Sequence, residues 1–249
     1  MTAKNDTSWG NVADWYKGVV SEEGSYQKDL ILPNLLRMMG ISKGENILDL
    51  ACGEGFMSRA LKERGATVTG VDISPELIAL AKKSSEDIDF RVSPADKLSF
   101  IADSSLDKAV IILAVQNMED PIGVFNECSR IIRSGGCLYL VINHPCFRVL
   151  KGSSWGYDAE GMYRRIDRYL SELKVDINIH PGLKDGKTTL SFHRPLQYFT
   201  KALNKAGFAI SRLEEWNSGK TSQPGPRAAA ENRARKEIPL FMALECRKL

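Results

Sequence analysis

The sequence predicts an open, doubly wound α/β fold, and two observations lead to this prediction. Short apolar runs alternate with segments of helical composition between residues 46 and 142, with glycines or N-capping residues between them. The run 108–114 (KAVIILA) lacks polar alternation, which is typical of a strand covered on both faces. Because parallel strands need crossover helices, this order favours a parallel sheet with helices on both faces.

Each element has its own local signal. Apolar positions at helical spacing follow Tyr26, and Gly40 caps that helix; β-branched residues mark the strand 67–72. Ser74 and Asp120 each precede a proline, as at a helix start, and Gly135-Gly136 predicts a helix end. The expected strands are 46–51, 67–72, 88–92, 108–114, 137–142, 208–213 and 239–246. The expected helices are 26–39, 56–64, 74–84, 120–133 and 196–205, with candidate strands near 165–179 and 188–193, short helix or coil at 1–25 and a long loop at 216–236.

Composition excludes several classes of protein. The 249 residues are 43% hydrophobic and 26% charged, so the chain can bury a core, and a net charge of +3 is too small for a protein dominated by nucleic-acid contacts. Five cysteines without a CxxC pair predict neither a zinc cluster nor a disulfide framework. The polar start and the absence of an apolar run near ~20 residues predict no secretion signal and no membrane span. We expect a cytoplasmic globular protein.

The most informative segment is residues 49–56 (DLACGEGF), which leaves a strand, turns on glycines and enters a helix. Gly53 and Gly55 permit close backbone approach and positive φ. Asp72 ends the next strand, where a carboxylate accepts hydrogen bonds from both ribose hydroxyls of a nucleoside. In a doubly wound sheet the ligand binds at the carboxyl ends of the strands, so the expected site lies at the turns after residues 51, 72, 93, 115 and 142.

Two cofactors compete for this geometry. A dinucleotide fingerprint would have glycine at position 58, where this chain has Ser58, so NAD(P) is the weaker alternative. The segment DLACGEG resembles motif I of the class I S-adenosylmethionine-dependent methyltransferases, D-L-G-C-G-x-G, with Ala51 in place of the first glycine. The resemblance covers roughly residues 26–143 and 188–249 and is greatest to the quinone and small-molecule methyltransferases. It continues through VDIS at 71–74, SPAD at 93–96, IIRSGG at 131–136 and KAGF at 205–208.

The resemblance implies a Rossmann-like sheet of seven strands, the last antiparallel, with a cap insertion after the fifth strand. It implies a single domain, 1–249, made of an N-terminal helical lid (1–42), a cofactor-binding half (43–143), the cap insertion (144–187) and the rest of the core sheet (188–249). The cofactor would be S-adenosyl-L-methionine, and no metal is implied.

The resemblance also implies a role for each motif position. Asp49 and the backbone of 51–55 (Ala51, Cys52, Gly53 and Gly55 among them) would hold the methionine end. Asp72 would bind the ribose and Ile73 would pack on adenine. Asp96 and the backbone of Ala95 would contact the adenine amine, and Ala114 and Val115 would lie under the sulfonium. The alternative for Ile73, Ala114 and Val115 is that they are core residues at strand ends.

Acceptor-site candidates lie on the rim of the sheet or in the cap. His144 follows the fifth strand and is either a general base or an anchor of the insertion. His193 and Arg194 either bind an anionic acceptor or cap the next helix. Gln116 and Asn117 either orient a substrate or form a structural turn. Tyr16, Trp155, Tyr157 and Tyr163 form either an aromatic lid over the acceptor or a small core of the insertion.

The preferred function is methyl transfer to a small organic acceptor by a monomer or homodimer, without nucleic-acid or membrane partners. The chain lacks the N/D-P-P-Y/F turn of nucleic-acid amino-methylating enzymes after its fourth strand and has QNME at 116–119 instead. Two other functions stay open: an NAD(P)-linked oxidoreductase, and a cofactor-binding but catalytically silent subunit of the same fold.

Overall fold

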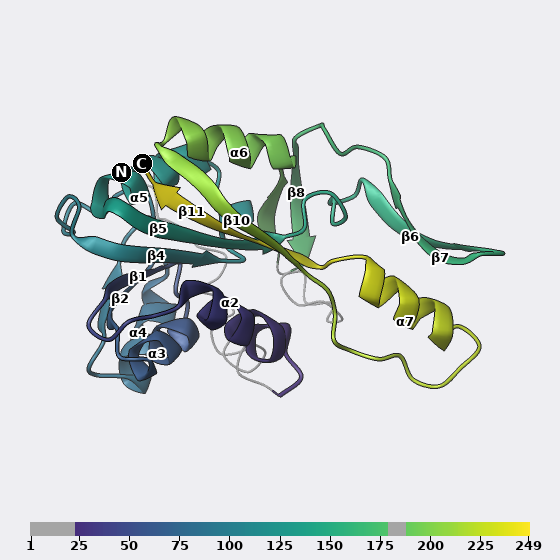
Figure 1. The fold of residues 1–249 in the computed structure, drawn as a ribbon, viewed down its shortest axis with the longest axis horizontal. Helices are drawn as coiled ribbons and strands as arrows, with labels where there is room; N and C mark the ends of the chain where they lie inside the picture. The colour runs from purple at the N-terminus through teal and green to yellow at the C-terminus, as the bar shows by residue number, and fades with distance from the viewer. Residues whose placement is uncertain (1–22, 179–187) are drawn as a thin grey trace.

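Seven strands form a single mixed sheet in the computed structural model, which describes residues 23–178 and 188–249. Their order across the sheet is β10-β11-β5-β4-β1-β2-β3 (Figure 1). β1, β2, β3, β4 and β5 run parallel, whereas β11 is antiparallel to both of its neighbours. The predicted Rossmann-like fold with an antiparallel last strand is therefore confirmed. The strands are β1 (Asn46–Leu50), β2 (Thr67–Asp72), β3 (Asp89–Val92), β4 (Leu106–Ile112), β5 (Ile132–Asn143), β10 (Phe208–Trp216) and β11 (Phe241–Lys248).

Helices cover both faces of the sheet, as Figure 1 shows. A π-helical turn, η2 (Gln27–Ile31), leads into α2 (Leu32–Met39), which ends at the left-handed Gly40 as predicted. The Ser74 hydroxyl accepts a hydrogen bond from the Leu77 amide and caps α4. The remaining helices are α3 (Phe56–Glu63), α4 (Pro75–Ser84), the 3₁₀ turn η3 (Val115–Asn117), α5 (Pro121–Ile131), α6 (Leu196–Lys205) and α7 (Ala228–Glu237).

The hydrophobic core has two halves, one on each face of the sheet, because successive strand side chains point to opposite faces. On one face Ile47 and Val110 pack with side chains of α2, α3 and α4. On the other face Leu48 and Ile111 pack with side chains of α5 and α6. This double burial explains why the run 108–114 is apolar throughout.

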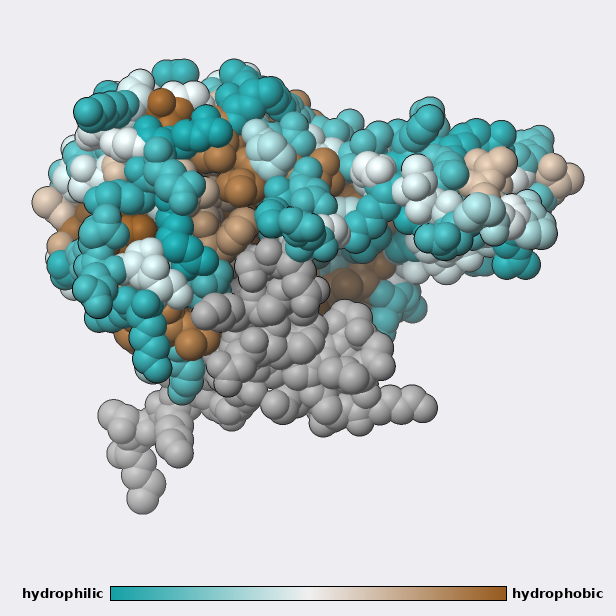
Figure 2. Space-filling view, turned by 90° about the horizontal axis from the view of Figure 1, so that it is seen from below, coloured by the Kyte–Doolittle hydropathy of each residue, from teal (hydrophilic) through white to brown (hydrophobic). Residues whose placement is uncertain are grey.

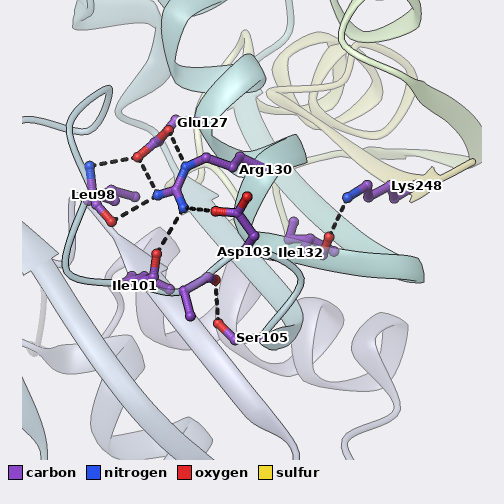
Figure 3. Close-up of polar contacts among 9 residues, drawn as sticks. Leu98, Ile101, Asp103, Ser105, Glu127, Arg130, Ile132 and Lys248 are labelled. Carbon is purple, nitrogen blue, oxygen red and sulfur yellow. Dashed lines mark hydrogen bonds and ion pairs between the residues drawn. The ribbon is translucent and has the colours of Figure 1, made fainter.

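A network centred on Arg130 ties α5 to the connection between β3 and β4 (Figure 3). Its guanidinium donates to the Leu98 and Ile101 carbonyls at 3.0 and 2.9 Å and forms ion pairs with Glu127 and Asp103. These carboxylates raise the pKa of Arg130. The network therefore fixes the chain just before β4, which carries part of the site described below.

The insertion after β5 contains two small hairpins. β6 (Ser153–Asp158) pairs with β7 (Gly161–Ile166), and β8 (Leu173–Asn178) pairs with β9 (Thr188–His193). The first hairpin and α7 form an arm that projects from the sheet, and its surface is mostly hydrophilic (Figures 1 and 2). No helix within the described residues has the length and apolar character needed to cross a membrane.

Three expectations about elements were wrong. The segment 216–236 was expected to be a loop, yet it contains most of α7, whose only buried residue is Ala234. The helix expected to run to residue 133 ends at Ile131, and β5 begins at Ile132, before the glycine pair. The hairpin β6–β7 was not predicted. Residues 1–22, with Tyr16 and part of the expected lid, and residues 179–187 of the cap lie outside the described residues.

Candidate functional site

The main cavity lies at the carboxyl ends of β1, β2 and β4, where the strand order reverses. Its volume is about 620 Å³ when the space open to solvent is included. Each of the three strands supplies part of the wall through the turn that follows it. The lining residues are Ala51, Gly53, Asp72, Ile73, Leu77, Ile112, Leu113, Ala114, Asn117 and Met118.

A second cavity of about 440 Å³ adjoins the first, because Ala51 and Ile112 line both. Asp49 from β1 and Cys52 from the turn after β1 line it, together with Gln27 from η2. The two cavities thus place one carboxylate, Asp72, in the first and another, Asp49, in the second, on either side of Ala51.

The Asp72 carboxylate is fixed by backbone amides. The Gly53 amide donates to Oδ2 and the Ser74 amide donates to Oδ1, both at 2.9 Å. Burial raises the pKa of Asp72, and these amide hydrogen bonds oppose that rise. The carboxylate is therefore held rigidly at the cavity wall, and each oxygen keeps a lone pair for a further donor.

Asp49 is 2% exposed and accepts a hydrogen bond from the Ser58 hydroxyl at 2.5 Å. Burial raises the pKa of Asp49 to about 7, and the nearby Asp72 carboxylate adds to the rise. Ser58, which stands where a dinucleotide fingerprint would have glycine, thus positions the Asp49 side chain. A carboxylate that is this poorly solvated attracts a cationic ligand group strongly.

Backbone strain is concentrated at the main cavity. Ala51 and Leu113 adopt left-handed φ values of +60° and +51°, and both line the cavity. Among the described residues, Ser104 and Lys151 are the other two non-glycine residues with positive φ. Such strain costs about 1–3 kcal/mol per residue and clusters at ligand sites. Ala51 occupies the position where the methyltransferase motif has glycine, which would adopt this φ without strain.

Gly55 was expected to contact the cofactor, but it lines neither cavity. It begins α3 with φ +82°, and a Cβ built on it would lie 2.7 Å from Cζ of Phe90. A Cβ on Gly70 would lie 2.4 Å from Cδ1 of the same ring. The glycines therefore make room for a buried phenylalanine.

Of the other residues expected to contact the cofactor, some line the main cavity and some do not. Ile73 and Ala114 line the main cavity. Val115 is fully buried in the core, Ala95 packs against that core, and Asp96 is exposed; none of these three lines the two cavities.

A third cavity, of about 360 Å³, lies at the end of β5. Gln116, the neighbour of Asn117 in η3, forms part of its wall, as do His193 at the end of β9 and Arg194, the next residue. The buried atoms Gln116 Oε1, Asn117 Oδ1 and Arg194 Nη1 have no hydrogen-bond partner. His193 Nε2 donates to the Tyr169 carbonyl at 2.7 Å.

His144 is buried, and both of its ring nitrogens are bonded within the protein. Its Nε2 lies 2.6 Å from Oε1 of Glu215 on β10, and its Nδ1 accepts a hydrogen bond from the Cys146 amide. Burial lowers the pKa of His144, while Glu215 opposes the change. His144 lines none of the three cavities.

Three of the aromatic residues expected in a lid lie on the β6–β7 hairpin, namely Trp155, Tyr157 and Tyr163, and they line none of these three cavities; Trp155 lines another cavity, with Tyr26 and Arg148. The Tyr157 hydroxyl donates to Glu231 on α7 at 3.2 Å, and the Arg164 guanidinium stacks over Trp155. Tyr163 lies across Gly156. Each of these three is more than a third exposed.

Some site residues were missed by the sequence reading. Leu77, Leu113 and Met118 line the main cavity, and Arg148 lines the third. Their residue types do not indicate a binding site. Their positions could have done so, because Leu77, Leu113 and Met118 lie within one turn of a predicted strand end or helix start.

The two adjoining cavities fit the cofactor implied by the resemblance. S-adenosylmethionine carries an α-ammonium group, a ribose with two hydroxyls and an apolar ring with an amine. Asp49 would hold the ammonium, Asp72 the ribose, and the apolar wall formed by Ile73 and Leu77 would face adenine. The unpartnered Asn117 Oδ1 offers one further acceptor for an N–H or O–H donor. Within the described residues, no cluster of three His, Cys, Asp or Glu side chains has the arrangement of a metal site.

Similarity to known proteins agrees with this arrangement. Residues 48–140 match a family model described as a methyltransferase domain. A ubiquinone biosynthesis O-methyltransferase from Xanthomonas campestris is 32% identical over 101 residues, which cover 39% of this chain and 42% of the relative. One from Xanthomonas oryzae is 31% identical over 123 residues, 46% of this chain and 52% of the relative. The chain spans about half the length of the curated relatives it matches.

The fold is also similar to a solved S-adenosylmethionine-dependent methyltransferase from Mesorhizobium loti. The two are 29% identical with a TM-score of 0.69, over 87% of this chain and 96% of the other. Residues 48–140 therefore match a methyltransferase domain, and the sheet order, the glycine turn and the acid that ends β2 agree with the fold of S-adenosylmethionine-dependent methyltransferases.

Proposed function

We propose that this chain transfers the methyl group of S-adenosylmethionine to a small organic acceptor. The observation that carries the proposal is the pair of adjoining cavities at the switch point of the sheet, with the buried Asp72 carboxylate in one and the buried Asp49 carboxylate in the other. The similarity to proteins named as O-methyltransferases supports a small acceptor that bears a hydroxyl group.

The chain's own residues bind and orient, while the sulfonium of the cofactor supplies an activated methyl group. Asp49 holds the methionine end, Asp72 binds the ribose and Ile73 packs against adenine. The backbone of Gly53 and Ala114 completes the wall, so both reactants are held in fixed positions. Fixing two reactants in an aligned geometry is a major source of rate acceleration in such displacements.

His144 acts as a positioning residue in this proposal. Its ring nitrogens already serve Glu215 and the Cys146 amide, so neither faces an acceptor hydroxyl. His144→Ala is expected to lower the melting temperature and raise KM while changing kcat less than threefold, because it loosens the segment after β5. The measurement is kcat at saturating acceptor from pH 6 to 9. A loss of ~10²–10⁴ in kcat would instead assign His144 as the general base.

The function is tested by turnover. The protein is incubated with S-adenosylmethionine and a panel of phenols, hydroxy acids and amines, and formation of S-adenosylhomocysteine is followed. We expect turnover with at least one hydroxyl-bearing acceptor. Binding of NAD without binding of S-adenosylmethionine would replace the proposal with an oxidoreductase. Cofactor binding without turnover on any acceptor would leave a catalytically silent subunit.

Several properties stay predictions from sequence alone. These are a cytoplasmic location, a monomeric or homodimeric state, the absence of nucleic-acid partners, and the division of one domain into lid, cofactor-binding half, cap and C-terminal part. Gel filtration with light scattering measures the oligomeric state directly.

A further inference from the structure

We propose that the cavity at the end of β5 binds the carboxylate of an aromatic hydroxycarboxylic acid, with Arg194 as its anchor. This inference rests on the proposed function, because it names the class of acceptor that the methyltransferase would use. It is carried by three features of the cavity wall: a buried guanidinium nitrogen without a hydrogen-bond partner, a buried acceptor atom without a donor, and the absence of an acidic lining residue.

Arg194 is a rigidly held cation. Its side chain is 5% exposed, its Nη2 donates to the Glu119 carbonyl at 2.9 Å, and its guanidinium stacks on the ring of Phe192. Its Nε lies 3.8 Å from the exposed Glu172 carboxylate, too far for a hydrogen bond. Nη1 is buried and has no partner. A buried guanidinium N–H without a partner is unfavourable, and an anionic oxygen would satisfy it with a charge-assisted hydrogen bond.

Gln116 contributes a hydrogen-bond acceptor to the cavity, whereas Arg194 contributes a donor. Its Nε2 donates to the Leu113 carbonyl at 2.8 Å, which fixes the orientation of the amide. Oε1 is then left buried without a donor. A ligand that satisfies both groups must offer an anionic oxygen to Arg194 and an O–H or N–H to Gln116.

The charge of the lining favours anions. Arg148 also lines the cavity, and its guanidinium has no hydrogen-bond or ion-pair partner among the described residues. No aspartate or glutamate is among the lining residues. Ile142, Phe192 and Phe199 supply apolar walls, which suit a flat hydrocarbon ring more than a polar chain.

The cavity lies beside the proposed cofactor site. Gln116 lines it, while the next residue, Asn117, lines the main cavity. Ile142 and Ile112, near the ends of the adjacent strands β5 and β4, line the third and the main cavity respectively. A ligand anchored at Arg194 would therefore have its ring and hydroxyl next to the η3 turn, on the side of the cofactor.

The test uses the full chain and calorimetry. S-adenosylhomocysteine is titrated first, and then the three hydroxybenzoate isomers and their methyl esters are titrated into the loaded protein. We expect at least one hydroxybenzoate to bind at least tenfold more tightly than its ester. Arg194→Met should remove this preference while leaving affinity for S-adenosylhomocysteine within twofold. Arg165→Met, which removes an exposed arginine of β7 paired with Asp167, is the matched control and should change neither affinity.

Arg148→Met provides a second test if Arg194→Met does not fold, because the Arg148 guanidinium has no hydrogen-bond or ion-pair partner among the described residues to lose. It should weaken binding of the acid at least threefold and leave the ester unchanged. Equal binding of acids and esters, or no binding of any hydroxybenzoate to protein that binds S-adenosylhomocysteine, would overturn the anionic subsite alone. Failure to bind S-adenosylhomocysteine would overturn the proposed function as well.

Discussion

Ala51 and Leu113 hold the main cavity open with left-handed backbone at two neighbouring strand ends. The methyltransferase motif made Ala51 visible in the sequence, because glycine is the usual residue there. Leu113 gave no such signal, since leucine rarely adopts positive φ and the residue lies within an apolar run. The motif therefore drew attention to position 51 without predicting its positive φ, and nothing in the sequence pointed to Leu113.

Ala51→Gly is expected to stabilise the protein by up to about 1 kcal/mol, because glycine adopts φ near +60° without a steric penalty. The melting temperature should rise by a few degrees. Ala60→Gly, within α3, is the control and should destabilise by about 0.5–1 kcal/mol, since its backbone is helical. A loss of stability in Ala51→Gly would show that the left-handed backbone is not strained.

Asp49 predicts how cofactor affinity depends on pH. Its pKa of about 7 means that the neutral carboxyl predominates below pH 7 in the free protein, and a cationic ammonium group requires the ionised form. Affinity for S-adenosylhomocysteine is therefore expected to fall by roughly tenfold per pH unit below 7. Calorimetry at pH 5.5–7.5 measures this slope. Asp49→Asn should bind more weakly with a flatter profile, and an unchanged slope in that variant would assign the titration to another group.

At the scale of elements, predictions succeeded where an apolar period or a capping residue marks a boundary. The bounds of α4 and β2 agree with the sequence, since Ser74 caps the helix and β-branched residues mark the strand. α7 was missed because only Ala234 of its ten residues is buried, so it has no apolar period to detect. The β6–β7 hairpin was missed because neither of its strands has a fully buried residue, so no alternation of buried apolar and exposed positions marks it.

Phe90 of β3 couples three elements through the space left by Gly55 and Gly70. Gly70→Ala is expected to destabilise by at least about 2 kcal/mol, because the new Cβ would lie 2.4 Å from the Phe90 ring. Phe90→Ala alone should cost about 3–5 kcal/mol. Chemical denaturation of the double variant completes the cycle: the two losses should be less than additive by at least about 1 kcal/mol. Strict additivity would contradict the close contact.

At the scale of the whole molecule, the proposed cofactor half of the site was predictable, and the proposed acceptor half was predictable only as separate candidates. Asp49, Gly53 and Asp72 lie in one βαβ unit, so their spacing along the chain predicts that they are close together in the fold. Gln116 and Arg194 belong to distant elements, and only tertiary packing of β9 against η3 brings them to one cavity. Which nitrogen of Arg194 lacks a partner depends on that packing and has no signal in sequence.

The measurement that tests the account most directly is calorimetric binding of S-adenosylhomocysteine to wild-type protein and to Asp72→Ala. The account predicts binding to the wild type and a loss of at least tenfold in the variant, since charge-assisted hydrogen bonds contribute roughly 1.5–3 kcal/mol each. Asp89→Ala, which removes an exposed carboxylate paired with Arg91 on β3, should bind as the wild type does. Undiminished affinity in a folded Asp72→Ala variant would contradict the assignment of this cavity to the cofactor.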